Sequence, residues 1–306
     1  MKLDNPIFKD AEKAREHLEA INWPHGPVCP HCGETKNVTR LKGKSHRPGL
    51  IQCNTCTKNF TVTVGTVFER SKVPLNKWLL ATYLLSSSKK GMSAKQIERM
   101  LGVTYKTAWF MCHRIREAMR DTNTTPMGSG GGAVEADETF IGKEPGKKTK
   151  SGYFHKMKVL SLVDRDTGRS KSMVVDSLKA PDIAPIVFEN VSREAKLMTD
   201  EASHYQAIGF QYANHESVNH SKGEYGRGIV HTNTIEGYFS IFKRGMKGIY
   251  QHCDKAHLHR YLAEFDFRYS NREALGVNDG ERTDRVLAGI RGKRLTYRRT
   301  DKAALA

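Results

Sequence analysis

The sequence predicts an α/β fold in which a mixed central sheet with helices follows a cysteine-rich module and a helical segment. After residue 132, strand-like and helix-like runs follow in the order βββαβαβα, which is typical of one sheet covered by helices. Two C-x-x-C pairs stand upstream of residue 60. At 306 residues the chain is long enough to bury more than one hydrophobic core, so we expect several domains.

The two cysteine pairs predict a metal site. Cys29 and Cys32 form the first pair, Cys53 and Cys56 form the second, and twenty residues separate the pairs. That spacer can form a hairpin that brings both pairs onto one ion, and four thiolates make a closed tetrahedral site. The alternative is four reduced cysteines without a ligand. We expect one structural Zn²⁺ in a zinc ribbon.

Residues 73–119 have the pattern of short amphipathic helices. Ser93 suits a helix N-cap, Gly102 suits a tight turn, and Thr104 suits the next N-cap. Two short helices around such a turn resemble a helix-turn-helix, whose second helix reads DNA. The alternative is a helical bundle that only supports the following domain. The expected DNA contacts from the second helix are Tyr105, Lys106, Thr107 and Arg114.

A glycine-rich segment at 128–132 predicts a linker, and the strands begin behind it. The residues 166–168 suit a hairpin turn between the second and third strands. The expected strands are 133–141, 157–165, 169–177, 195–200 and 216–220, and the expected helices are 180–191, 203–209 and 232–248.

Three acids fall where such a sheet would bring them together. Asp137 lies in the first strand, Asp200 ends the fourth, and Glu236 lies near the start of the last helix. Carboxylate oxygens suit Mg²⁺ or Mn²⁺. Two alternatives stay open. Glu135 shares the strand face of Asp137, and Asn233-x-x-Glu236 resembles a capping box that would use Glu236 only for its helix.

The last helix also carries cations. Asn233, Glu236, Ser240 and Lys243 are spaced three, four and three apart, so they share one helix face. Lys243 can hold a phosphate near the acids, or it can be a solvated lysine. The phosphate contacts expected from this helix are Asn233, Lys243, Arg244 and Lys247.

Composition favours a polyanionic partner. The formal net charge is +17, which points to nucleic acid rather than to a particular fold. No apolar run reaches the roughly 20 residues of a membrane span. The charged start of the chain lacks the apolar stretch of a signal peptide, so we expect a cytoplasmic protein without a membrane partner.

Taken together, these segments resemble bacterial insertion-sequence transposases of the Asp-Asp-Glu type, in the zinc-ribbon group called ISXO-like. The resemblance runs from about Ala11 to Arg272, and the element order resembles the ribonuclease H-like fold. The segments that carry it are WPHGPVCPHCG, FTVTVGTVFERSKVPLNKWLLATYLLSSSKKGMSA, LGVTYKTAWFMCHRIREAM, EADETFIGK, TDEASHY, HTNTIEGYFSIFKRGMKGIYQHC and FRYSNR.

The resemblance implies a site and an activity. Asp137, Asp200 and Glu236 would be the catalytic triad with two Mg²⁺ or Mn²⁺ ions, and Lys243 would match the family's lysine. The chain would bind the terminal inverted repeats of an insertion sequence, cleave the 3′ ends and transfer them into target DNA. A homodimer or larger assembly on double-stranded DNA, in a nucleoid-associated bacterial location, is expected.

Two rival functions remain. One is a metal-dependent DNA nuclease of the same fold, and the other is a zinc-ribbon regulator whose acids are inert. The expected domains are 1–70 for the zinc-ribbon region, 71–127 for the helical segment, 128–132 for the linker, 133–275 for the catalytic domain and 276–306 for a basic tail. The stretch 282–302, with eight basic residues against two acidic ones, reads as a DNA-contacting or disordered tail.

Overall fold

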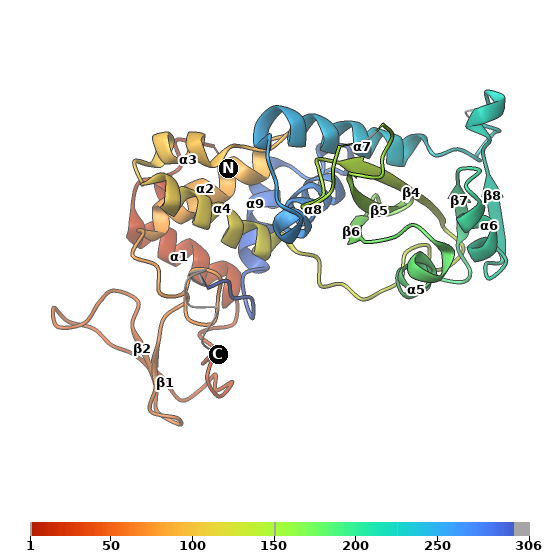
Figure 1. The fold of residues 1–306 in the computed structure, drawn as a ribbon. Helices are drawn as coiled ribbons and strands as arrows, with labels where there is room; N and C mark the ends of the chain where they lie inside the picture. Colours follow the sequence, from red (N-terminus) through yellow and green to blue (C-terminus); the bar gives the residue numbers. More distant parts are fainter. Residues whose placement is uncertain (1, 150, 225, 297–306) are drawn as a thin grey trace. The chain divides into compact units, whose positions relative to one another are not determined.

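The computed structural model describes residues 2–149, 151–224 and 226–296 (Figure 1). The chain divides into two compact units. The first unit joins residues 1–119 to residues 278–306, and the second comprises residues 120–277. The division falls at Met119, upstream of the glycine segment that predicts a linker.

The first unit contains a small antiparallel sheet that carries the cysteines. Its middle strand pairs with both neighbours, and Ile51 lies opposite both Arg40 and Phe60. Ile51, Cys53 and Phe60 are fully buried, so this sheet has a small core of its own. The strands are β1 (Val38–Arg40), β2 (Ile51–Cys53) and β3 (Asn59–Phe60).

The helical part of the first unit contains the expected pair of helices around a glycine turn. The Ser93 hydroxyl accepts a hydrogen bond from the backbone N–H of Gln96 at 3.2 Å, and Gly102 ends the helix with a left-handed φ of 60°. The helices are α1 (Ala11–Asn22), α2 (Leu75–Ser87), α3 (Ala94–Leu101), α4 (Tyr105–Met119) and α9 (Asp279–Ala288).

Helix α9 lies inside the stretch that the sequence suggested as a tail. Asn278 and Glu281 form a reciprocal capping box at its start, and the Thr283 hydroxyl bonds to Ser86 of α2 at 2.9 Å. The disordered alternative is therefore wrong for residues 279–288, because this helix is packed and capped. Residues 297–306, the end of the expected tail, lie outside the described residues.

The second unit is built on a five-stranded sheet of order β6-β5-β4-β7-β8. Strand β4 runs antiparallel to β5 and parallel to β7, so the first and fourth strands of this unit are neighbours, as expected for a ribonuclease H-like fold. The last strand covers 214–217 rather than the expected 216–220. The strands are β4 (Ala133–Ile141), β5 (Met157–Asp164), β6 (Ser170–Val175), β7 (Lys196–Thr199) and β8 (Asn214–Ser217).

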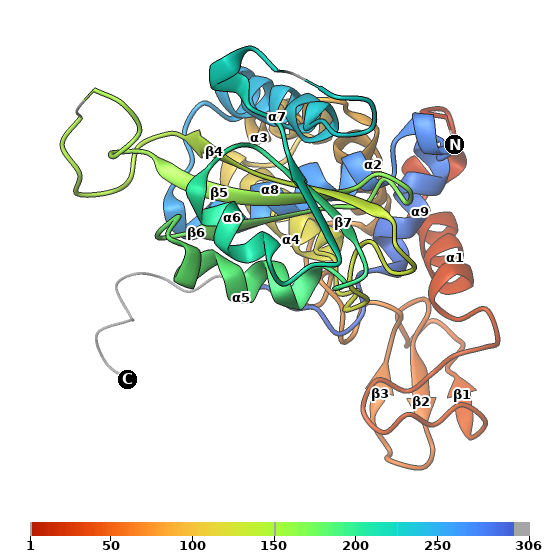
Figure 2. The same cartoon turned by 90° about the vertical axis from the view of Figure 1, so that its right-hand side faces the viewer.

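Helices cover both faces of this sheet (Figure 2). One apolar cluster joins Ala136 and Leu160 to α5 and α6, and the other joins Val159 to α7 and α8. The helices are α5 (Ala180–Asn190), α6 (Ser203–Gly209), α7 (Asn233–Gly245), which continues as a π-helix over Met246–Tyr250, and α8 (Lys255–Ser270). Alternate side chains of β4 therefore point toward different helix layers.

The glycine segment 128–132 packs against the sheet of the second unit. The backbone N–H of Gly128 donates to the Asp164 carboxylate at 3.0 Å. Gly128 has a φ of +70°, and a Cβ there would lie 2.5 Å from the Cβ of Ala195. Glycine is needed here for close approach, which a freely moving linker would not require.

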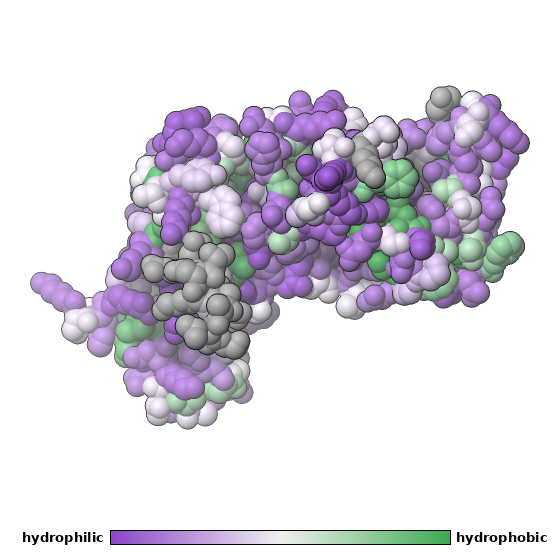
Figure 3. Space-filling model, in the orientation of Figure 1, coloured by the Kyte–Doolittle hydropathy of each residue, from purple (hydrophilic) through white to green (hydrophobic). Residues whose placement is uncertain are grey.

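The surface seen in Figure 3 is mostly hydrophilic on each unit. Among the described residues, no helix is both long enough and apolar enough to cross a membrane.

Candidate active site and zinc centre

The four cysteines of the two C-x-x-C pairs come together as predicted. Their sulfur atoms all lie within 4.8 Å of one another, with 3.7 Å between Cys29 and Cys56 and 3.6 Å between Cys32 and Cys53. A tetrahedron with Zn–S bonds of about 2.3 Å has edges of about 3.8 Å, so the sulfur cage has the size that one Zn²⁺ requires. The cluster supports one structural zinc.

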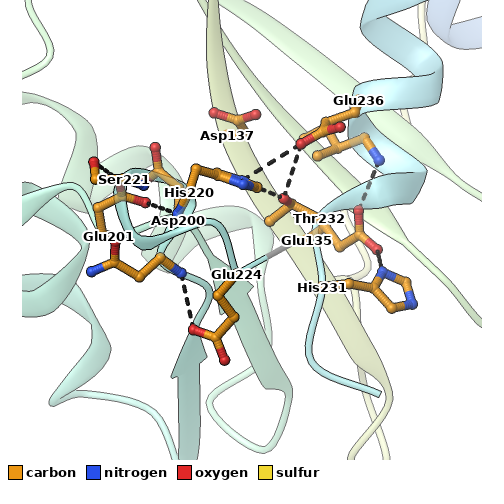
Figure 4. Close-up of polar contacts among 12 residues, drawn as sticks. Glu135, Asp137, Asp200, Glu201, His220, Ser221, Glu224, His231, Thr232 and Glu236 are labelled. Carbon is orange, nitrogen blue, oxygen red and sulfur yellow. Dashed lines mark hydrogen bonds and ion pairs between the residues drawn. The ribbon is translucent and has the colours of Figure 1, made fainter. Parts of the chain in front are cut away.

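Asp137 lies in the middle of β4, opposite Ser161 of β5. Burial first, and then the negative charges of Glu138 and Asp200, raise the pKa of Asp137 to about 8, and Glu236 adds to this effect. The other three carboxylates are therefore close enough for their charges to act on Asp137. Figure 4 shows Asp137, Asp200 and Glu236 reaching the same region from β4, the end of β7 and α7.

Asp200 directly follows β7, at the edge of the sheet where α6 begins. One of its oxygens accepts a hydrogen bond from the backbone N–H of Ala202 at 3.0 Å. The next residue, Glu201, has a different task. Its carboxylate accepts from the backbone N–H groups of His220 and Ser221 and from the Ser221 hydroxyl, and these bonds hold a loop near the site.

Glu236 does not form the capping box that its sequence suggests. Asn233 is the first residue of α7 rather than its N-cap, and no side chain of the N-cap residue Thr232 caps the helix. The carboxylate of Glu236 faces Thr232 at 3.5 Å and the His220 ring at 3.6 Å, and its side chain is 50% exposed. An accessible carboxylate at this place remains available to a ligand.

The start of α7 is held instead by Glu135 (Figure 4). This carboxylate is fully buried and accepts a hydrogen bond from the backbone N–H of Ile235 at 2.7 Å. It also pairs with the Arg165 guanidinium at 2.5 Å. With these partners, Glu135 has the surroundings of a structural anchor rather than of a substitute for Asp137.

Lys243 faces the acids across a cavity. The cavity has a volume of about 690 Å³; Asp137, Asp200 and Lys243 line it, whereas Glu236 is not among its lining residues. Burial lowers the pKa of Lys243 and the negative charge of Asp137 raises it, so the ammonium group and this carboxylate interact. The cavity thus combines carboxylates that can bind cations with an ammonium group that can bind a phosphate.

Comparison with known protein families identifies two domains of this chain. Residues 130–270 match the ISXO2-like transposase domain, and residues 9–59 match the transposase zinc-ribbon domain. The chain belongs to the ISXO2-like transposases. Membership of this family implies transposase function and DNA binding.

A curated relative agrees with this assignment over most of its length. The uncharacterized protein in transposable element ISH50 of Halobacterium salinarum is 28% identical over 289 residues, which cover 88% of this transposase and 95% of the relative. That organism is an archaeon, so the similarity supports the family and leaves the expected bacterial source a prediction.

Sequence reasoning missed Glu138 as part of the candidate site. Strand periodicity points it away from Asp137, yet it lines the same cavity as Asp137 and Asp200. Its carboxylate accepts a hydrogen bond from the Tyr205 hydroxyl of α6 at 2.9 Å, and the His204 ring lies 3.5 Å away. No sequence signal locates Glu138 here, because the contact with α6 is made 67 residues along the chain.

The residues of the expected helix-turn-helix differ in their exposure. Tyr105 is 50% exposed and Lys106 is also exposed, so both are accessible to DNA. Arg114 is only 8% exposed, and its guanidinium donates to the backbone carbonyls of Glu69 and Leu295. Arg114 is therefore a poor candidate for the expected DNA contact, because its side chain is buried and two of its nitrogen atoms donate inside the first unit.

Proposed function

We propose that this transposase binds the terminal inverted repeats of an insertion sequence, cleaves the 3′ ends and joins them to target DNA. The observation that carries the proposal is that Asp137 and Asp200 line one cavity with Lys243, while Glu236 of α7 is near enough for its charge to act on Asp137. Such a set of acids beside a phosphate-binding cation suits transfer of a phosphodiester.

The residues present fit divalent metal ions. The donor set is made of carboxylate oxygens, which Mg²⁺ and Mn²⁺ prefer. The raised pKa of Asp137 also reflects crowded negative charge that a cation would neutralise. When bound, two such ions would supply Lewis-acid stabilisation of the charge that develops on the phosphate and on the leaving oxygen. Asp137, Asp200 and Glu236 would hold them.

The other proposed contribution of the protein is to position the scissile phosphate. Lys243 would bind a non-bridging phosphate oxygen and so hold the scissile bond against the acids. With water as the nucleophile, the bond to the 3′ oxygen breaks and a 3′ hydroxyl is released. With that hydroxyl as the nucleophile, the same site exchanges one phosphodiester for another and joins the end to target DNA. A dimer or larger assembly would hold two ends together.

The test compares two single substitutions in the full-length protein. Asp200→Asn should leave DNA binding within about twofold of wild type and lower the Mg²⁺-dependent cleavage rate by at least about 10³-fold, because one metal-binding carboxylate is lost. Asp182→Asn, an exposed acid in α5, is the matched control and should cleave normally. Normal cleavage by Asp200→Asn would overturn the assignment.

An assay with precut transposon ends distinguishes strand joining from hydrolysis. A transposase joins a labelled 3′ hydroxyl end to plasmid DNA, whereas a nuclease of the same fold only nicks the plasmid. Nicked plasmid without joined product would replace the proposed function with the nuclease. Zinc-dependent DNA binding without either product would favour the regulator.

A further inference from the structure

The cavity beside the acids extends well past them. Its volume of about 690 Å³ lies within the range of pockets that hold whole small molecules, so there is room for more than one phosphate group. Asp137 and Asp200 occupy one part of the wall, and the aromatic rings of Phe140 and Tyr153 occupy another. The proposed chemistry uses only the acids and Lys243, which leaves this aromatic wall unexplained.

The two rings form a stacked platform. Their centroids are 4.5 Å apart with planes inclined by 16°. Phe140 lies on β4, three residues beyond Asp137, so the sheet fixes its position relative to the acids. Tyr153 is 58% exposed although it stacks on Phe140, and this exposure leaves much of its ring accessible. Aromatic rings that remain accessible next to a polynucleotide site are suitable surfaces for base stacking.

Cations surround the platform. The ammonium group of Lys156 lies over the Tyr153 ring, 5.1 Å from its centroid, so a base that stacks on this ring must displace the ammonium group, which is then free to contact a phosphate. Lys156, Lys243 and Lys247 all line the cavity, and the last of these is exposed on the π-helix that continues α7. Three ammonium groups around one aromatic wall suit a nucleotide, whose base stacks while its phosphates take the positive charge.

We propose that this cavity binds a single unpaired nucleotide next to the cleaved phosphodiester, with the base stacked on Tyr153 and the flanking phosphates held by Lys156 and Lys247. A base paired inside a duplex cannot present its face to Tyr153, because the base pairs on both sides cover its two faces. The base must therefore leave the stack, or come from an end that is already unpaired. This inference rests on the proposed function and names the form of DNA that the site takes.

The first experiment measures binding alone. The full-length protein is mixed with a short duplex that ends in one unpaired 2-aminopurine, in buffer without Mg²⁺ or Mn²⁺ so that no strand is cut. The matched probe is a duplex of the same length in which the 2-aminopurine is paired and has a base pair on each side. We expect wild type to bind the unpaired end about tenfold more tightly and to quench its fluorescence, because stacking on an aromatic ring quenches 2-aminopurine.

Substitutions of Tyr153 test whether its ring causes the quenching and the binding preference. Tyr153→Ala should abolish the quenching and the tenfold preference, whereas Tyr153→Phe should retain both because the ring remains. Phe210→Ala is the control, since Phe210 is 89% exposed and does not line the cavity. Equal quenching in wild type and Tyr153→Ala, or no preference for the unpaired end in wild type, would overturn the proposal.

This result is separable from the test of the triad, because the binding assay involves no cleavage. Cleavage that survives Asp200→Asn would overturn the catalytic assignment and leave a Tyr153-dependent nucleotide site in place. Loss of cleavage in Asp200→Asn without any Tyr153-dependent quenching would support the triad and overturn the nucleotide site.

Discussion

The carboxyl group of Asp137 is the most electrostatically strained group of the site. Burial and the charges of Glu138 and Asp200 raise its pKa to about 8, so in the absence of a cation it retains its proton over much of the neutral range. A metal ion requires the ionised form. Cation binding and loss of this proton are therefore coupled.

The coupling predicts that Mg²⁺ binding releases a proton. Below pH 8 the cation must displace the proton of Asp137, so affinity should rise with pH and level off above about pH 8, and proton release should disappear there. Titration calorimetry in buffers of different ionisation enthalpy measures the released proton directly. Binding without proton release below the pKa of Asp137 would contradict the expected state of this group.

The substitution Glu138→Gln tests whether neighbouring negative charge raises the pKa of Asp137. Of the charged neighbours of Asp137, Glu138 contributes most to raising its pKa, so its neutralisation should lower that pKa and move proton release to lower pH. Asp182→Asn removes an exposed acid outside the cavity and should leave the titration unchanged. A shift of the same size in both variants would show that the effect is one of net charge alone.

The first turn of helix α7 is held in place by a residue that lies outside the helix. Its first turn is bound by Glu135 of β4, one hundred residues earlier, and Glu135 in turn pairs with Arg165 at the end of β5. The anchor lies two residues before Asp137, so one strand both carries an acid of the site and positions the helix that carries Glu236. Periodicity on β4 left Glu135 and Asp137 as alternatives, and their partners separate them.

Glu135→Gln should therefore destabilise the second unit by about 3 kcal/mol, since it leaves Arg165 beside a buried neutral amide. Glu216→Gln is the matched control, because Glu216 pairs with Arg227 at the surface and should cost less than about 1 kcal/mol. Urea denaturation compares the two. Equal losses would show that the Glu135 pair adds nothing beyond a surface contact.

Local sequence patterns predicted some elements with their observed bounds. The strand expected at 133–141 coincides with β4, and the helix expected at 203–209 coincides with α6. Helix α8 was not predicted, because Glu264, Asp266 and Arg268 are buried in it and interrupt its apolar periodicity. Those charges are compensated by tertiary partners such as the Tyr238 hydroxyl, which donates to Asp266 at 2.7 Å.

Part of the candidate site could also be predicted from the sequence. The resemblance to the ribonuclease H-like fold placed Asp137 and Asp200 on neighbouring strands, and the cysteine spacing predicted the sulfur cluster. The position of Glu138 and the burial of Arg114 depend on contacts with distant segments, so the local sequence carries no signal for either.

The sulfur cluster and the acids belong to different compact units, each with its own core. Cys53→Ser should abolish zinc binding and weaken DNA binding, because the fully buried Cys53 is one of four ligands. The same variant should still release a proton from Asp137 on binding Mg²⁺. Zinc content is measured by metal analysis and the proton by calorimetry, and loss of both would show that the units do not fold independently.

A formal net charge of +17 predicts that DNA binding by the whole molecule is dominated by counterion release. The logarithm of the binding constant should fall steeply with the logarithm of salt concentration, by about 0.9 for each phosphate contacted. Lys106→Ala in α4 and Lys247→Ala at the cavity should each reduce that slope by about 1, because each removes one expected phosphate contact. Lys179→Ala, an exposed lysine just before α5, is the control and should leave the slope unchanged. If only Lys106→Ala changes the slope, the first unit makes the measured phosphate contacts and DNA does not occupy the cavity in that complex. If only Lys247→Ala changes the slope, the expected helix-turn-helix is a supporting bundle, and its predicted role as a DNA reader is wrong.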